Sequence, residues 1–113
     1  MKLKDVAQQP HLSLRCGGDH IDRDVTGGYA GDLLSDVIAN SKAGDVWLTM
    51  QVHMNIVAVA VLKDLAGIIL VGGREPAEET LERAKKEKVA ILVSDLPAFE
   101  TSGRLFTLIG GGA

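Results

Sequence analysis

The chain has 113 residues, a length typical of one domain, and its 46% apolar content can form a core without disulfides or a structural metal. The formal net charge is −3, and the basic residues are scattered or gathered in Lys85–Lys88, which argues against nucleic acid as a partner. We therefore expect residues 1–113 to form a single domain that binds no nucleic acid.

One cysteine, Cys16, cannot form an internal disulfide and cannot alone hold an iron–sulfur cluster, which ordinarily needs about four thiolates. The segment Met1–Val6 lacks the apolar core of a signal peptide. Lys63 and Asp64 interrupt the longest apolar region, Val52–Val71, whereas a membrane-spanning helix needs about 20 largely uncharged residues. We expect a cytoplasmic protein with no membrane segment, no metal site and no cofactor.

The first 40 residues mix short elements with a Gly-rich turn. Leu3–Ala7 predicts a short helix, and the alternating residues of His11–Cys16 predict a half-buried or edge strand. Ile21–Val25 alternates again, as a short strand or one arm of a hairpin would. Thr26–Asp32 predicts a Gly-rich turn, and the apolar stripe that follows predicts a helix from Asp32, its cap, to Asn40.

The segment Ile56–Leu62 is ambiguous between strand and helix. Its β-branched residues favour a strand, but it lies between two clear strands, Asp45–Met50 and Ala66–Val71. We predict a helix, because two parallel strands need a crossover of a dozen or more residues. A helix this apolar must be covered on both sides, for instance by a second subunit, so we expect a homodimer.

The remaining elements continue the alternation of strands and helices. Pro76–Lys88 has acidic residues at its start and lysines at its end, as a helix dipole favours. Val89–Val93 predicts a strand, Ala98–Leu105 a last helix, and Ile109–Ala113 a frayed tail. The expected fold class is α/β, a three-layer α/β/α sandwich around a mainly parallel sheet of four to six strands.

In an open α/β sheet, ligands bind beyond the carboxyl ends of the strands. We expect four loops to gather there: Val25–Tyr29, Met50–Asn55, Val71–Glu75 and Val93–Leu96. The candidate ligand-binding residues are those of the loops that offer flexible backbone or a polar side chain. They are Thr26, Gly27, Gly28, Gln51, His53, Asn55, Gly72, Gly73, Arg74 and Ser94.

These residues point to binding rather than to catalysis. The Gly pairs allow a ligand close to the backbone, yet neither turn matches a dinucleotide or P-loop fingerprint. Gln51, His53 and Asn55 alternate as they would at the end of a strand, and Arg74 is suited to clamp a phosphate or carboxylate, or to form a structural ion pair. No nucleophile or carboxylate lies near His53 in the sequence at a spacing that would indicate a catalytic pair, so we assign no catalytic residue.

Two blocks of the chain resemble the DRTGG domain family: Gly27–Val37 through His53–Ala60, and Ile68–Pro76 through Phe99–Thr101. The naming signature is only approximate, because Asp24 and Val25 separate Asp22-Arg23 from Thr26-Gly27-Gly28. The resemblance implies a dimeric regulatory or accessory module, found alone or joined to phosphotransacetylases and CBS-pair domains, with no catalytic residues to carry over. Some stand-alone relatives are labelled as iron–sulfur hydrogenase-associated proteins, which implies a hydrogenase or another enzyme as partner.

We therefore expect a non-catalytic regulatory or accessory module that binds a small polar or anionic ligand, with an adenine nucleotide as one candidate, and a protein partner. The ligand would stiffen the Gly-rich turns and bias an interface. Two alternatives stay open. One is an iron–sulfur hydrogenase-associated accessory protein, and the other is a small phosphoryl- or acyl-transfer enzyme with Arg74 as clamp and His53 as base.

Overall fold

The computed structural model of the protein describes residues 1–110, so the expected frayed tail lies outside the described residues from position 111 onward. The helices are α1 (Leu3–Ala7), α2 (Leu34–Asn40), α3 (Asn55–Lys63), α4 (Glu78–Glu87) and α5 (Ala98–Ile109), with a 3-10 turn at Gly18–His20. The strands are β1 (Leu12–Cys16), β2 (Gly27–Ala30), β3 (Asp45–Thr49), β4 (Gly67–Leu70) and β5 (Ile91–Ser94).

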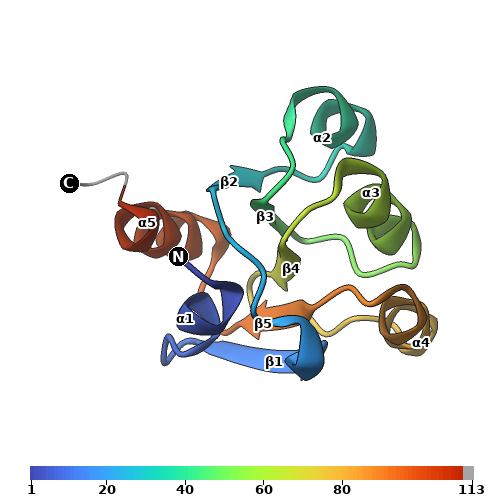
Figure 1. Cartoon of the computed structure of the whole chain (residues 1–113), viewed down its shortest axis with the longest axis horizontal. Coiled ribbons are helices and arrows are strands. Elements are labelled where there is room, and N and C mark those ends of the chain that lie inside the picture. Colours follow the sequence, from blue (N-terminus) through green and yellow to red (C-terminus); the bar gives the residue numbers. More distant parts are fainter. Residues whose placement is uncertain (111–113) are drawn as a thin grey trace.

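The five strands form one sheet in the order β1-β5-β4-β3-β2. Strands β2 to β5 are parallel, and β1 runs antiparallel to β5 at one edge. Helices α1 and α5 cover one face of the sheet, and α2, α3 and α4 cover the other (Figure 1). The three-layer sandwich with a mainly parallel sheet is confirmed.

Each face of the sheet carries its own apolar core, because successive residues of a strand point to opposite sides. Trp47, Ile68 and Ile91 pack under α2, α3 and α4, while Val46 and Ile69 belong to the core beneath α1 and α5. Trp47 also donates a hydrogen bond of 2.8 Å from its indole N–H to the carbonyl of Gly31, just beyond β2. Burial on both faces explains the continuous apolar runs of the inner strands.

The ambiguous segment is helical, as predicted. Helix α3 lies between β3 and β4 as their crossover and ends at Lys63; the next residue, Asp64, takes the left-handed conformation with φ 53°. Arg23 then secures this helix end: its guanidinium donates to the carbonyls of Leu65 at 2.8 Å and Asp64 at 3.3 Å, and to the Asp64 carboxylate at 2.7 Å. A cation beside the last carbonyls of a helix complements the helix dipole.

The prediction of a turn over Thr26–Asp32 is wrong. Gly27–Ala30 is an extended strand whose residues pair in parallel with Asp45–Leu48, so long-range pairing overrides the local preference of glycine for turns. Ile21–Val25 is not a strand of the sheet, and only an isolated bridge joins Asp24 to Lys2.

Two helix boundaries also differ from the prediction. Asp32 does not cap α2, which begins after Leu33, because the Asp32 carboxylate accepts hydrogen bonds from the Thr49 hydroxyl and the Met50 N–H. Helix α5 runs past Leu105 to Ile109. Among the described residues, no helix is both long enough and apolar enough to cross a membrane.

Candidate functional site

The structure divides the candidate residues between the two ends of the sheet. The loops after β3, β4 and β5 lie at the carboxyl edge, and they hold Gln51, His53, Asn55, Gly72, Gly73, Arg74 and Ser94. Thr26, Gly27 and Gly28 lie at the amino end of β2, where Gly27 pairs with Asp45, the first residue of β3. The expectation that all four loops gather at one edge is therefore wrong.

The Gly72-Gly73 pair takes the positive φ angles expected of a glycine turn, 71° and 70°. Both backbone N–H groups of the pair already donate hydrogen bonds within the protein, however. The Gly72 N–H donates to the carbonyl of Leu96 at 2.8 Å, and the Gly73 N–H donates to the carbonyl of Ser94 at 2.7 Å. The pair joins the β4 loop to the β5 loop, and its N–H groups do not face outward as an anion cradle would require.

Ser94 is equally committed to the protein itself. Its side chain is fully buried, its hydroxyl shares a hydrogen bond of 2.7 Å with the Thr101 hydroxyl, and it accepts the N–H of Leu96 at 3.1 Å. Thr101 also donates within the first turn of α5, to the carbonyl of Pro97 at 2.9 Å. These bonds fix the start of α5 against β5.

The polar triplet of the β3 loop does not share one side of a strand, because β3 ends at Thr49 and Asn55 is the first residue of α3. Gln51 donates from its amide to the carbonyl of Asp32 at 3.0 Å, whereas His53 and Asn55 are exposed. Chain reversal after β3 thus separates residues that the alternating pattern had placed together.

Arg74 and Glu75 have different surroundings. The exposed Arg74 side chain makes one long contact of 3.4 Å with the carbonyl of Val71. Glu75 forms a bidentate pair with Arg15 of β1, with distances of 2.6 and 2.7 Å. The hydrogen bonds from Arg15 lower the pKa of the Glu75 carboxyl. The structural ion pair weighed for this loop therefore involves Glu75 rather than Arg74.

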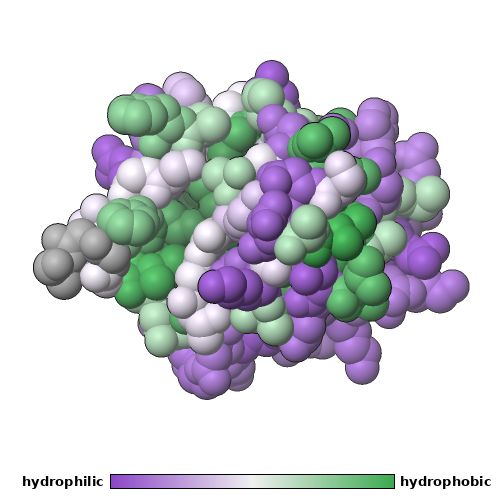
Figure 2. Space-filling model, turned by 90° about the horizontal axis from the view of Figure 1, so that it is seen from above, coloured by the Kyte–Doolittle hydropathy of each residue, from purple (hydrophilic) through white to green (hydrophobic). Residues whose placement is uncertain are grey.

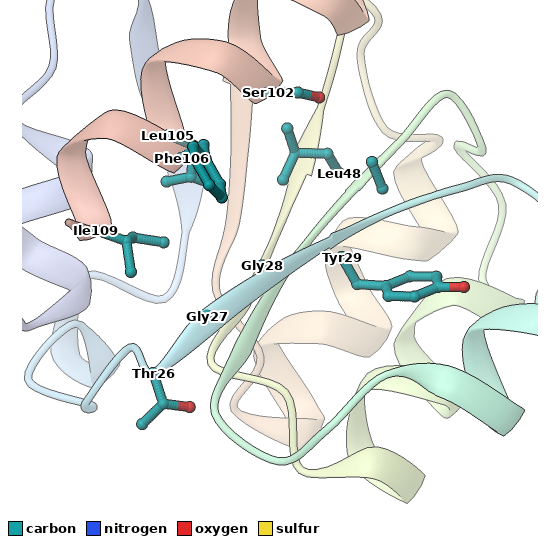
Figure 3. Close-up of a pocket in the computed structure, with 10 residues that line it drawn as sticks. Thr26, Gly27, Gly28, Tyr29, Leu48, Ser102, Leu105, Phe106 and Ile109 are labelled. Carbon is teal, nitrogen blue, oxygen red and sulfur yellow. The ribbon is translucent and has the colours of Figure 1, made fainter. Parts of the chain in front are cut away.

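A hollow that none of the four loops predicts in full lies between β2 and α5 and has a volume of about 380 Å³ (Figure 3). We call it the β2–α5 groove. Apolar residues gather on this side of the molecule (Figure 2). The groove is lined by Thr26, Gly27, Gly28, Tyr29, Ala30, Leu48, Ser102, Leu105, Phe106 and Ile109.

The two walls of the groove have different chemistry. One wall is the backbone of β2, where a Cβ added to Gly28 would lie 3.4 Å from Leu105 Cδ2 and 3.5 Å from the Val46 carbonyl. The other wall is α5, from which Phe106 and Ile109 project toward β2 (Figure 3). Phe106 is 64% exposed, a large apolar side chain left open to solvent beside a glycine floor.

The polar groups of the groove are neutral. The ten described residues that line it include no charged side chain; Thr26 and Ser102 supply hydroxyls, and the Thr26 hydroxyl donates to the Ala43 carbonyl at 3.3 Å. Because β2 is the last strand of the sheet, one side of its backbone has no neighbouring strand. The groove thus combines apolar side chains with five consecutive residues at this edge of the sheet, Thr26 to Ala30.

Sequence reasoning found the β2 side of this groove and missed the α5 side. Ser102, Leu105, Phe106 and Ile109 follow the spacing i, i+3, i+4 and i+7, which places them on one helical stripe. The same spacing continues past Leu105 in the sequence, and it would have predicted Phe106 and Ile109 on this face of the helix.

The described residues that line the groove include no carboxylate, imidazole, amine or thiol side chain. Burial raises the pKa of the Cys16 thiol, which donates to the Val89 carbonyl on the opposite face of the sheet from α5. Within residues 1–110, no group of three or more His, Cys, Asp or Glu side chains is placed to hold a metal ion.

Comparison with solved structures supports this fold. The chain is similar to the CBS and DRTGG domains of the regulatory region of Clostridium perfringens pyrophosphatase, complexed with its activator diadenosine tetraphosphate. The TM-score is 0.72 at 16% identity, over 95% of this chain and 46% of that one, so this chain spans about half the length of that relative. A search of curated proteins found no match. The DRTGG domain model matches residues 34–108, and the chain therefore belongs to the DRTGG domain family.

Proposed function

We propose that this chain is a non-catalytic regulatory module that binds a small molecule with a flat ring, an adenine nucleotide first among the candidates, in the β2–α5 groove. The observation that carries the proposal is the groove itself. Its volume of about 380 Å³ falls within the roughly 300–1,000 Å³ of small-molecule sites, and its walls are apolar with a few polar groups. The nucleotide activator of the similar regulatory region supports this choice of ligand.

The walls of the groove suit a flat heteroaromatic ring. Gly27 and Gly28 leave a floor without side chains, and the ring of Phe106 offers a surface for stacking. Adenine presents an amino donor beside a ring-nitrogen acceptor, which matches the N–H and C=O groups along the open edge of β2. Because the lining residues carry no charge, the phosphates would extend from the groove into solvent.

Regulation would follow from the position of the ligand between two elements. A ring held between β2 and α5 favours conformations with one spacing of these elements over others, and a ligand shifts an equilibrium only by such differential binding. Helix α5 contacts both β2 and β3, so a change in its position reaches the strands beside it.

Calorimetry with ADP and with diadenosine tetraphosphate tests the site. Phe106→Ala removes the stacking surface and should weaken binding by about 5-fold or more, in line with the roughly 1–3 kcal/mol that base–aromatic stacking contributes. Phe99→Ala is the matched control, because Phe99 lies on the same helix, is 86% exposed and does not line the groove. Equal binding by wild type and Phe106→Ala would remove the groove as the site.

We further propose a second copy of the chain as protein partner, bound through the outer side of α3. This helix exposes apolar residues: Val61 is 47% exposed and Leu62 is 67% exposed, beside an exposed Met54. A helix that is apolar on all sides is normally covered, and an isologous dimer would cover this one.

Light scattering after size exclusion tests the dimer. Leu62→Glu should yield the monomer mass at concentrations where the wild type is dimeric, and Phe99→Glu, an exposed apolar position on the opposite face of the sheet, should keep the wild-type mass. A monomeric wild type at about 100 µM would exclude a stable dimer.

A further inference from the structure

A histidine with an unsatisfied ring nitrogen lies beneath α5. His11 precedes β1 and is only 8% exposed, and its Nδ1 is buried without a hydrogen-bond partner in the described structure. It lines a small hollow that has no space for the centre of a water molecule, together with Ile69, Arg104 and Leu105. The β2–α5 groove lies on the other side of the same helix.

Leu105 connects the two hollows, because it lines both the hollow at His11 and the β2–α5 groove. The residues on either side of Leu105 line different hollows. Arg104 lines the hollow with His11, and Phe106 lines the groove. A shift of α5 at the His11 side therefore moves a wall of the groove.

Protonation changes what His11 requires from its surroundings. The neutral ring carries one N–H, whereas the imidazolium carries N–H groups at both nitrogens, so Nδ1 becomes a buried donor that has no acceptor. Burial, and then the charge of Arg104 on α5, lower the pKa of His11, while Asp95 in the β5–α5 turn opposes them. Gln9 and Thr101, which also line the hollow, are uncharged.

We infer that His11 is a proton-sensitive latch for α5: the neutral ring keeps the helix docked on the sheet, and its protonation releases the helix and reshapes the β2–α5 groove. The imidazolium gains water at Nδ1 only where α5 moves away from the hollow, since the docked helix leaves no space for it. Docking is then complete above the His pKa of the unfolded chain, near 6.5, and weakens as pH falls below it. The effect on a ligand rests on the proposed function, whereas the latch itself does not.

Nuclear magnetic resonance tests the latch without any ligand. The His11 ring and the backbone amides of residues 98–109 are followed from pH 8 to pH 5 in the wild type, in His11→Gln and in His53→Gln, the exposed control histidine. We expect the α5 amides to shift with the midpoint of the His11 ring, in wild type and His53→Gln but not in His11→Gln. Arg104→Gln should raise that midpoint. Titration of the His11 ring without any response of α5 would overturn the latch.

A second arm measures the affinity for ADP at pH 7.5 and pH 5.5. The wild type should lose at least about 3-fold more affinity than His11→Gln, and the protonation of ADP itself cancels in this comparison. Equal losses in the two proteins would overturn the control of the groove by His11. Absence of ADP binding at both pH values would instead count against the proposed function, and the amide titration would still decide on the latch.

Discussion

Substitutions of Gly28 can separate an effect on folding from an effect on ligand binding. Gly28 lies in β2, outside the glycines with positive φ, so a side chain meets no backbone strain there. A Cβ at this position would approach Leu105 at 3.4 Å and the Val46 carbonyl at 3.5 Å, which is ordinary contact. We predict that Gly28→Ala folds normally, while Gly28→Val fills the floor of the groove.

A side chain at position 28 is expected to affect stability and ligand affinity differently. Glycine inside a strand costs roughly 0.5–1 kcal/mol relative to alanine, so Gly28→Ala should raise the free energy of unfolding by about that amount. This corresponds to an increase in Tm of roughly 2–6 °C for a domain of this size. Gly28→Val gains strand propensity, but its methyl groups extend beyond a Cβ that already contacts Leu105, so its free energy of unfolding should stay within about 1 kcal/mol of wild type. It should weaken ADP binding by about 10-fold through overlap with the ligand ring.

Urea unfolding and calorimetry on the same samples check both effects. Gly44→Ala is the contrasting control: Gly44 has φ 87°, and a Cβ there would collide with the Thr26 hydroxyl, so this variant should lose stability. Wild-type affinity in a folded Gly28→Val protein would refute the assignment of β2 as the floor of the ligand site.

Three further predictions concern contacts that hold the elements together. Arg23→Gln removes the charged donor from the end of α3 and should cost about 1–2 kcal/mol in urea unfolding, with Arg23→Lys recovering part of the loss. Thr101→Val removes a buried hydroxyl shared with Ser94 and should cost about 1–3 kcal/mol; a loss below about 0.5 kcal/mol would mean that this network does not hold α5. The solvent-accessible Arg15–Glu75 pair should show a coupling of at most about 1 kcal/mol in a double-mutant cycle at pH 7. Because the pKa of Glu75 is lowered, this coupling should be present above about pH 4.5 and vanish as pH falls through the folded-state value.

The fold was predictable where local pattern and chain connectivity agreed. The helix Asn55–Lys63 followed from the length that a parallel crossover requires, although its composition favours a strand. The strand Gly27–Ala30 was not predictable from local preference, because two adjacent glycines favour a turn and only pairing with Asp45–Leu48 makes them extended. Strand order in the sheet decided the structure of this segment.

The site was less predictable than the fold, since its parts are distant in the chain. The turn at Gly72 and Gly73 has the expected backbone, but the carbonyls that occupy its amides come from Ser94 and Leu96. Phe106 lines the same groove as Gly28 only because α5 packs beside β2. Local spacing identifies flexible or polar residues, and it cannot show which of them tertiary contacts have already satisfied.

Trp47, the sole tryptophan of the chain, is an intrinsic fluorescent probe for the position of strand β2. Its indole is fully buried and hydrogen-bonded to the carbonyl of Gly31, the residue that follows β2. Displacement of β2 would expose the indole or break that bond, and its fluorescence emission would shift to longer wavelength. Intrinsic fluorescence can therefore follow movement of this strand in the unlabelled, unmodified protein.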